Sequence, residues 1–477
     1  MTEFTPQTKV GLFAIGLDTY WPQFEGLKER LLGYHERVRQ GLESGGVEVL
    51  DAGLVDNADQ ARAAGEQLRA GGVEAVFLFI STYALSSTVL PVVQRAGVPV
   101  VVLNLQPVPQ LDYERFNALG DRGLMTGVWL EHCQACCAPE IASVFGRAGI
   151  DYHLVSGYLD DPAAWREIGE WLAAARVRAA LRANRFGVLG HYYGGMLDVY
   201  SDLTAQSTTF GCHVELLEMC QLAEHRRAVT AAETAAKLAE FDQAFEVSPD
   251  CAPAELERAA RTSVALDKLA EGHGLGSLAY YYEGAAGSEY EDIVTSVIAG
   301  NTLLTGRGLP VAGECEVKNA AAMKILDCFG AGGSFSEFYL ADFVDQVVYL
   351  GHDGPAHPAI AEGRLGLVPL PVYHGKPGCG LSIQMTVKHG PVTLLSVVQG
   401  PDGKLSLLCA EGESAPGPVL QIGNTNSRYR FSLGAAEFLN AWSAAGPAHH
   451  CAIGVGHLAG KIEKLAALLG IACQRVA

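Results

Sequence analysis

The sequence predicts an α/β protein, with two Rossmann-like or flavodoxin-like α/β domains followed by a C-terminal β-rich domain. Continuous apolar runs with many β-branched residues, Glu74–Thr82 and Val98–Gln106, are typical of parallel strands covered on both faces. Stretches with helical apolar spacing alternate with such runs. After about Phe335, short β-like segments separated by turns such as "GPDGK" predict an antiparallel sheet or barrel.

The elements follow in chain order. A strand over Lys9–Gly16 precedes a helix over Phe24–Ser44, and Asp161–Asn184 is a long helix of good propensity. A second α/β cycle opens with "RFGVLGHYYGGMLDVYSD" (Arg185–Asp202), which predicts strand, glycine loop and helix. The segment His457–Ala477 predicts a helix and a last short strand. We place the domain boundaries at 1–177, 178–327 and 328–477.

Bulk composition limits the function. At roughly 150 residues per domain, 477 residues suggest about three domains. Lys and Arg number 34 and Asp and Glu number 53, a net charge of −19, which argues against a nucleic-acid or anionic-membrane partner. No apolar run approaches the ~20 residues that span a bilayer. The N-terminal segment has no basic start followed by an apolar stretch, so we expect no signal peptide and a cytoplasmic protein.

The 12 cysteines are scattered, which fits buried thiols in a reducing compartment better than a disulfide framework. Cys133, Cys136 and Cys137 contain a C-x-x-C, but no second pair follows at a usual zinc spacing, so we interpret them as structural or incidental thiols. The glycines after the strand at Arg185 do not fit G-x-G-x-x-G, and no G-x-x-x-x-G-K-[ST] occurs. A nucleotide site is therefore unsupported.

Two glutamates and two histidine-containing segments stand out in the C-terminal third. They are Glu314, Glu337, His352 and the pair His449 and His450. A mixed oxygen and nitrogen set suits Mn²⁺, Mg²⁺, Co²⁺ or Zn²⁺, with Mn²⁺ favoured when carboxylates and waters share the sphere. The residues do not form a local motif. A glutamate near a turn is otherwise a solvated surface residue, and a lone histidine is otherwise an exposed or hydrogen-bonded one.

The local context of these residues resembles the L-arabinose isomerase family, within the arabinose and fucose isomerase group. The resemblance covers about Arg185–His457, is faint before that, and is carried by four segments in the family's order. The third segment is one residue shorter before its histidine than in the family. The segments are "GECEVKNAAAMKIL" (Gly313–Leu326), "SFSEFY" (Ser334–Tyr339), "YLGHDG" (Tyr349–Gly354) and "GPAHHCAI" (Gly446–Ile453).

The resemblance implies metal ligands at Glu314, Glu337, His352 and His450, with Mn²⁺ as the ion and Co²⁺ or Mg²⁺ as other candidates. It implies a sugar isomerase, an intramolecular oxidoreductase that interconverts an aldose and a ketose, with Glu314 and Glu337 as catalytic groups. It also implies a homo-oligomer, a trimer or hexamer, with sites between subunits. We expect Glu316 to cap its helix or lie at the surface; a supporting role behind the site is the alternative.

The sequence departs from the family where the sugar would bind. Family members carry a Ser-Gln-His-Leu-Tyr-like run near the sugar, where this chain has "GLDTYWPQF" (Gly16–Phe24), and "EHCQACCAPE" (Glu131–Glu140) is a loose counterpart of a second segment. The sugar is thus left open among pentoses, hexoses and deoxy sugars. His374 and Lys376 either approach the site or decorate a turn. The candidate substrate-binding residues are His191, Asp18, Thr19, His132 and His449.

Two carboxylates beside a cation suit isomerisation through an enediol, because they can serve as ligands and as proton carriers. The residues alone do not say which glutamate is the base. A metal-dependent sugar epimerase or lyase is an alternative within enzymes. A sugar-binding regulatory protein on a two-lobed α/β scaffold is the alternative from another class, and fold alone does not separate them. Adjacent residues in a strand point to opposite faces, so we expect His450 and not His449 to reach the ion.

Overall fold

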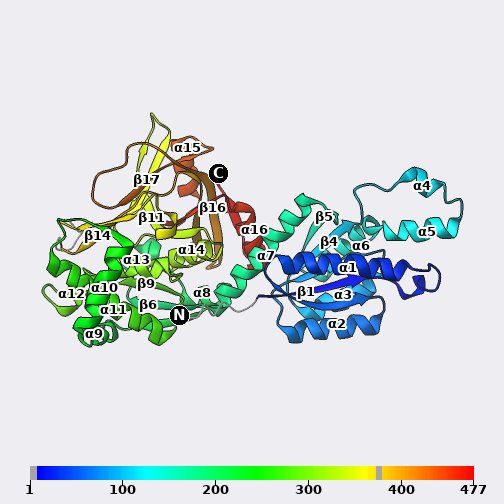
Figure 1. Cartoon of the computed structure of the whole chain (residues 1–477), viewed down its shortest axis with the longest axis horizontal. Coiled ribbons are helices and arrows are strands. Elements are labelled where there is room, and N and C mark those ends of the chain that lie inside the picture. Colours follow the sequence, from blue (N-terminus) through cyan, green and yellow to red (C-terminus); the bar gives the residue numbers. More distant parts are fainter. Residues whose placement is uncertain (1–7, 372–378) are drawn as a thin grey trace. The chain divides into compact units, whose positions relative to one another are not determined.

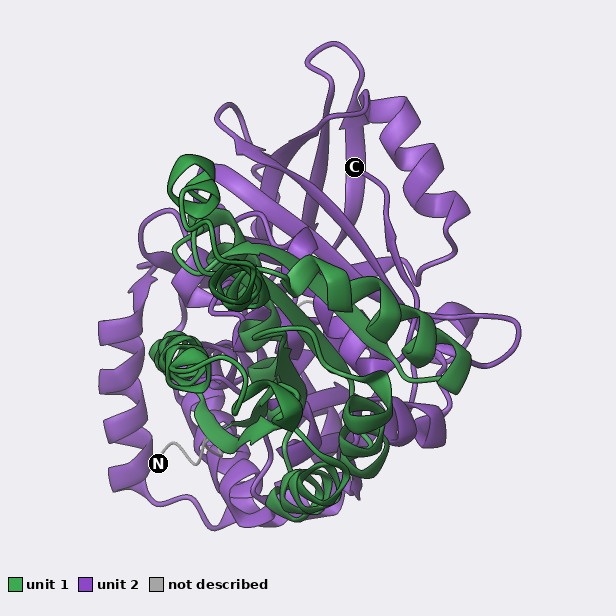
Figure 2. Cartoon of the chain, turned by 90° about the vertical axis from the view of Figure 1, so that its right-hand side faces the viewer, with its two compact units in different colours: residues 1–179 green, residues 180–477 purple. Residues whose placement is uncertain are grey.

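The computed structural model describes residues 8–371 and 379–477 of the chain. The chain divides into two compact units, Met1–Ala179 and Ala180–Ala477 (Figure 2). Each unit is described by itself below, with the element labels of Figure 1.

The first unit contains a five-stranded parallel sheet in the order β2-β1-β3-β4-β5, with helices between the strands. This is the strand order of flavodoxin-like sheets. Strands β3 and β4 are buried almost throughout, as their continuous apolar runs predict. The elements are β1 (Lys9–Ile15), η1 (Asp18–Tyr20), α1 (Leu27–Ser44), β2 (Glu48–Val55), α2 (Ala58–Gly71), β3 (Val76–Phe79), α3 (Ser86–Ala96), β4 (Val100–Gln106), α4 (Tyr113–Asn117), α5 (Arg122–Glu131), α6 (Gln134–Ala148), β5 (Tyr152–Tyr158) and α7 (Pro162–Ala183).

The second unit begins with a four-stranded parallel sheet in the order β10-β9-β6-β7. The chain runs from β6 outward to β7 and then returns to β9 on the other side, so the strand order reverses between β6 and β9. Ligands of open α/β sheets bind beyond the carboxyl ends of the strands at such a point. The elements are β6 (Arg185–Gly190), η2 (Leu197–Val199), α8 (Leu203–Phe210), β7 (His213–Leu217), α9 (Met219–Arg227), α10 (Ala231–Ala244), β8 (Phe245–Val247), α11 (Pro253–His273), β9 (Ser277–Tyr281), α12 (Glu289–Val294), α13 (Ile298–Gly306), β10 (Val311–Ala312) and α14 (Val317–Cys328).

The C-terminal part forms a closed six-stranded antiparallel barrel in the order β15-β18-β11-β12-β17-β16, and pairing of β15 with β16 closes it. Strand β19 adds to β16 in parallel, and β13 and β14 form a small sheet with β8. The elements are β11 (Gly332–Asp342), β12 (Val347–His352), η3 (Pro358–Ile360), β13 (Leu365–Pro369), β14 (Leu381–Gln384), β15 (Gly390–Gln399), β16 (Leu405–Ala415), β17 (Thr425–Phe431), α15 (Ala435–Ala444), β18 (His450–Val455), α16 (Ala459–Leu469) and β19 (Cys473–Arg475).

A single hydrophobic cluster joins the barrel to the helices that precede it. It contains Leu350 and Ile453 from barrel strands together with Ala260 of α11 and Ile298 of α13. Helix α14 packs against β9 and β10 and also against β11, β15 and β18. The parallel sheets and the C-terminal antiparallel barrel agree with the predicted fold class, while the division into three domains stays a prediction.

The predicted elements are found with one local exception. The helix expected before Asp202 is absent; that stretch holds only the short turn η2, and α8 begins at Leu203. Asp202 is the N-cap of α8, and its carboxylate accepts hydrogen bonds from the backbone N–H groups of Thr204 and Ala205. Among the described residues, no helix combines the length and apolarity that crossing a bilayer requires.

A substitution at Gly351 tests how closely β12, which ends at His352, packs against β17. A Cβ at Gly351 would lie 2.0 Å from the carbonyl oxygen of Thr425 on β17. We expect Gly351→Ala to lower the free energy of unfolding by about 1–3 kcal/mol, the usual range for overpacking. Gly272→Ala, where nothing lies within 4 Å of the added Cβ, is the control and should leave stability unchanged or slightly raised. Equal urea midpoints for the two variants would contradict this close packing.

Candidate metal centre

The turn between β10 and α14 carries Glu314 at the carboxyl edge of the parallel sheet. Glu314 and Cys315 both have positive φ angles, 56° and 58°. Consecutive residues of this kind are uncommon outside glycine and cost on the order of 1–3 kcal/mol each. The turn is held by hydrogen bonds from Cys315 N to Tyr280 O (2.9 Å) and from Tyr193 N to Glu314 O (3.3 Å). The surrounding strand ends therefore fix the position of Glu314.

The register of the barrel places Glu337 beside His450. In β11, Glu337 pairs with His450 of β18 on one side and with Gly351 of β12 on the other. Phe335, two residues earlier on the same face, packs its ring 4.4 Å from the ring centres of both His352 and His450. An apolar ring thus supports both imidazoles beside the carboxylate.

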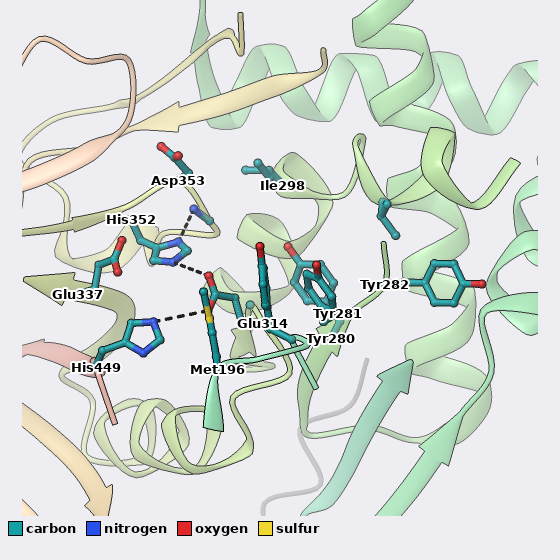
Figure 3. Close-up of a pocket in the computed structure, with 14 residues that line it drawn as sticks. Met196, Tyr280, Tyr281, Tyr282, Ile298, Glu314, Glu337, His352, Asp353 and His449 are labelled. Atoms are coloured by element: carbon teal, nitrogen blue, oxygen red, sulfur yellow. Dashed lines mark hydrogen bonds and ion pairs between the residues drawn. The ribbon is translucent and has the colours of Figure 1, made fainter. Parts of the chain in front are cut away.

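The polar atoms of these side chains converge. Glu314 Oε1 lies 4.0 Å from His352 Nε2 (Figure 3). Glu314 Oε2 lies 3.5 Å from His450 Nε2. His449 Nε2 also lies 3.6 Å from Glu314 Oε2. Two overlapping groups have ligand atoms within 4.8 Å of one another: Glu314 with both histidines of the pair, and Glu337 with His352 and His450. The structure therefore brings together all five residues that the sequence singles out.

The donor set suits a divalent cation. His450 is 1% exposed, and neither of its ring nitrogens has a hydrogen-bond partner, nor does Glu314 Oε2. Buried polar atoms without partners are rare and require an explanation, for which a bound ion is an ordinary one. Carboxylate oxygens and imidazole nitrogens are ligands for Mn²⁺, Co²⁺ and Zn²⁺. Glu314, Glu337, His352 and His450 would hold the ion.

His352 has one hydrogen bond that limits its role. The backbone N–H of Gly354 donates to His352 Nδ1 at 2.9 Å, so the neutral ring carries its proton on Nε2, the nitrogen nearest Glu314. Ligation through Nε2 requires the opposite tautomer and release of the Gly354 contact. His450 faces no such competing donor.

Glu316 corrects an expectation. It occupies the N-cap position of α14, but its side chain makes no capping hydrogen bond and is 0% exposed. One oxygen lies 3.0 Å from Nζ of Lys318, and the other lies 3.7 Å from His450 Nδ1. Capping or surface exposure is therefore wrong, because α14 is buried on nearly all sides and its first turn has no solvent-facing side.

The expected separation of His449 from His450 is also wrong. Strand β18 begins at His450, so strand alternation does not govern His449, and the two ring centres are 3.8 Å apart. Asp198 accepts hydrogen bonds from the backbone N–H of His449 (3.0 Å) and from its Nδ1 (2.6 Å). Burial lowers the pKa of His449, but the carboxylates of Glu314 and Asp198 outweigh it and raise the pKa to about 9.

Burial and neighbouring charges together set the pKa of Glu337. Burial raises the pKa of Glu337; the imidazoles of His450 and His449 oppose that shift, and the carboxylates of Glu314 and Asp353 add to it. A bound cation would favour the ionised carboxylate instead. Asp353 is fixed by the side-chain amide of Asn424, which donates to it at 2.5 Å.

A cavity of about 160 Å³ opens beside the cluster, at the point where the order of the parallel strands reverses. Glu314, Glu337, His352 and His449 face one side of it in Figure 3. Its other walls are mostly aromatic and aliphatic. They comprise Tyr193, Met196, Tyr280, Tyr281, Tyr282, Val294 and Ile298.

Among the remaining candidate substrate-binding residues, His191 belongs to the second unit, and the others belong to the first. His191 is exposed after β6, with its ring 5.5 Å from that of Tyr281, and it does not line the cavity. Asp18 and Thr19 are exposed in η1 of the first unit, and His132 follows α5 there, its Nδ1 2.9 Å from Val128 O. Their substrate contacts stay predictions. His374 and Lys376 fall outside the described residues.

The cysteine cluster belongs to the first unit, and the candidate metal centre belongs to the second. Cys133 and Cys137 are buried, and each thiol donates to a backbone carbonyl. Burial raises the pKa of Cys137 to about 12, so its thiol stays protonated. The groups of described residues that could hold a metal contain no cysteine.

Sequence reasoning missed the residues that surround the ligands. Asp198 lies in a loop without a motif, and Tyr280, Tyr281 and Tyr282 resemble an ordinary apolar strand end. Our sequence analysis predicts no strand at this position, although Tyr280 and Tyr281 end β9 and the carboxyl ends of parallel strands form sites. No such signal exists for Asp198, whose partner is 251 residues away.

Comparison with known proteins gives one distant relative. No family model matches the chain. An L-arabinose isomerase from Nocardioides sp. (strain ATCC BAA-499 / JS614) is 24% identical over 347 residues, which cover 69% of this chain and 67% of that protein. The chain is thus similar, at a distance, to a sugar isomerase.

Solved structures add little. An ABC transporter periplasmic solute-binding protein from Actinobacillus succinogenes 130z, with bound D-allose, aligns with 13% identity over 64% of this chain and 78% of that chain, with a TM-score of 0.16. The apo-structure of D-lactate dehydrogenase from Escherichia coli aligns with 14% identity over 57% and 82% of the two chains, with a TM-score of 0.14. TM-scores of this size carry no information about the fold or function of this chain.

The histidine pair offers a direct test of the ligand set. We expect His450→Ala to weaken Mn²⁺ binding by more than the roughly 10–100-fold typical of losing a residue that only orients a ligand. His449→Ala should weaken it by less than about tenfold, because His449 is 35% exposed and belongs to only one of the two groups that could hold an ion, whereas His450 is buried and belongs to both. Isothermal titration of metal-free protein measures both. The reverse order of affinities would identify His449 as the ligand.

Proposed function

We propose that this protein is a metal-dependent aldose–ketose isomerase that acts on an uncharged sugar through an enediol intermediate. The observation that carries the proposal is the convergence of two carboxylates and buried imidazoles on the edge of a small cavity. The distant similarity to an L-arabinose isomerase supports the same reaction class.

The reaction moves a proton between adjacent carbons. A base removes the C2 proton of the open-chain aldose, and the proton is then returned to C1. Glu314 and Glu337 both line the cavity and would carry the proton, a role that typically contributes about 10²–10⁴-fold to the rate. The divalent cation would supply Lewis acidity for the sugar oxygens. We assign proton abstraction to Glu314, because the strained turn at the end of the sheet fixes it.

The residues that line the cavity indicate which class of sugar it could accept. The described residues that line it include no lysine or arginine, and three of them are acids. A phosphorylated sugar or sugar acid would meet the carboxylates of Glu314, Glu337 and Asp353. The raised pKa of His449 makes its ring a cation there, but that ring is already paired with Asp198 and Glu314. Tyrosine rings instead offer apolar faces to the C–H groups of a neutral sugar, as in other aromatic-lined pockets. We therefore propose a free pentose, hexose or deoxy sugar.

Further properties follow from the resemblance and belong to the proposal. The ion would be Mn²⁺, the protein would form a homo-oligomer of three or six chains, and its location would be the cytoplasm. A sugar-binding regulatory protein has no need of two partly buried carboxylates as proton carriers beside a cation. An epimerase or lyase would use the same groups and is separated by its products.

A substrate screen tests the proposal first. Metal-free protein with added Mn²⁺ should interconvert at least one neutral aldose and its ketose, as read by chromatography, and exhaustive chelation should abolish the conversion. Full activity of the protein with a metal content of zero would contradict the metal role. An epimer or a cleavage product would assign one of the alternative reactions.

Glu314→Gln tests the assigned base, because an amide cannot accept the proton. We expect turnover to fall by about 10²–10⁴-fold, while Glu246→Gln, at an exposed glutamate of β8, stays at the wild-type rate. Turnover of the aldose in D₂O should place deuterium at C1 of the ketose. A Glu314→Gln variant that isomerises at the normal rate would rule out this assignment.

A further inference from the structure

Lys318 is a buried amine in the first turn of α14, and it joins two parts of the site. It is 3% exposed. Its Nζ donates to the carbonyl oxygens of Asp198 (2.8 Å) and Tyr200 (3.3 Å), and lies 3.0 Å from Glu316 Oε1. An ammonium group has three donors, of which two go to these carbonyl oxygens, while the contact with Glu316 is an ion pair. Lys318 therefore contacts both the segment 191–202 and the residue at the start of α14.

On the loop side, Lys318 holds the segment 191–202 that follows β6. Tyr193 and Met196 of this segment line the cavity. Asp198, whose carbonyl accepts from Lys318, uses its carboxylate to bind both the backbone and the ring of His449. The segment thus contacts the sugar cavity and the histidine pair at once.

On the helix side, Lys318 holds Glu316 next to His450. Glu316 Oε2 lies 3.7 Å from His450 Nδ1, both residues are buried, and neither atom has a hydrogen-bond partner. A metal-binding histidine almost always donates its other ring N–H to a carboxylate, carbonyl or water, which fixes its tautomer. Glu316 is placed to be that acceptor, which leaves His450 Nε2 for the ion.

We propose that Lys318 is a positioning residue that couples the cavity-lining segment 191–202 to the metal centre through Glu316 and His450. The inference rests on the metal site of the proposed function and adds a role that the ligands alone do not have. Lys318 also balances the charge of the buried Glu316, so that Glu316 can orient His450 without leaving an unpaired charge in the core.

The tautomer of His450 links metal binding to the segment 191–202. When Nε2 of His450 is bound, the ring must carry its proton on Nδ1, which favours donation to Glu316. A Glu316 carboxylate drawn toward His450 keeps its second oxygen on Lys318, whose remaining donors fix the segment 191–202. Coupling between two sites is reciprocal, so ordering of the segment should in turn strengthen metal binding.

The test compares wild type, Lys318→Met and the matched control Lys324→Met. Lys324 lies on the same helix, and its Nζ binds the carbonyl of Gly308 at 2.7 Å, away from the histidines. Titration calorimetry gives the Mn²⁺ affinity, and hydrogen exchange of residues 191–202 is measured with and without Mn²⁺. We expect Mn²⁺ to slow exchange in wild type and in Lys324→Met. In Lys318→Met, we expect Mn²⁺ affinity to fall about 10–100-fold and the Mn²⁺-dependent protection to be lost.

A second variant keeps the test decisive if Lys318→Met fails to fold. Glu316→Gln with Lys318→Met removes both charges together and leaves no unpaired carboxylate, and the same two losses are expected. Wild-type affinity with wild-type protection in either folded variant would overturn the coupling while leaving the metal site intact. Absence of Mn²⁺ binding in wild type would remove the metal site itself, and the coupling with it.

Discussion

The pairing of β11 with β18 is the constraint on which the candidate site depends. Because Glu337 stands directly opposite His450, a carboxylate and an imidazole share one face of the barrel at neighbouring positions. A slip of one residue would turn Glu337 to the opposite face. On its other side, Glu337 pairs with Gly351, whose missing side chain lets β17 approach closely. The same register therefore positions Glu337, His450 and the strand end that carries His352.

Charge balance explains why these groups can be buried together. Glu316 and Lys318 form an internal ion pair, which balances the charge of Glu316. Glu314 and Glu337 remain, and two carboxylates close to one another in a partly buried site repel unless one is protonated or a cation lies between them. A divalent ion would compensate both charges, and His450 Nε2, which has no hydrogen-bond partner, would be a further ligand.

The sequence predicted the architecture where periodicity is strong. The runs that became β3 and β4 were clear, and so was the change to short strands after Phe335. The clustering of Glu314, Glu337, His352 and the histidine pair was predicted from residue type and family resemblance, and the geometry brings these residues together. The environment of Glu316 was not predictable, because an alanine-rich first turn does not reveal that sheet and barrel cover α14 from both sides. The contact of Asp198 with His449 depends on tertiary structure alone.

The proposed function depends most on a cation held by residues from four separate segments. Crystals grown with Mn²⁺ test for this cation most directly. Diffraction data collected on both sides of the manganese absorption edge locate the ion without reference to activity. We predict one strong anomalous peak within about 2.0–2.6 Å of carboxylate oxygens of Glu314 and Glu337 and of a ring nitrogen of His450, the usual range for such ligands. No peak at these residues, or a peak bound only elsewhere in the chain, would contradict the account.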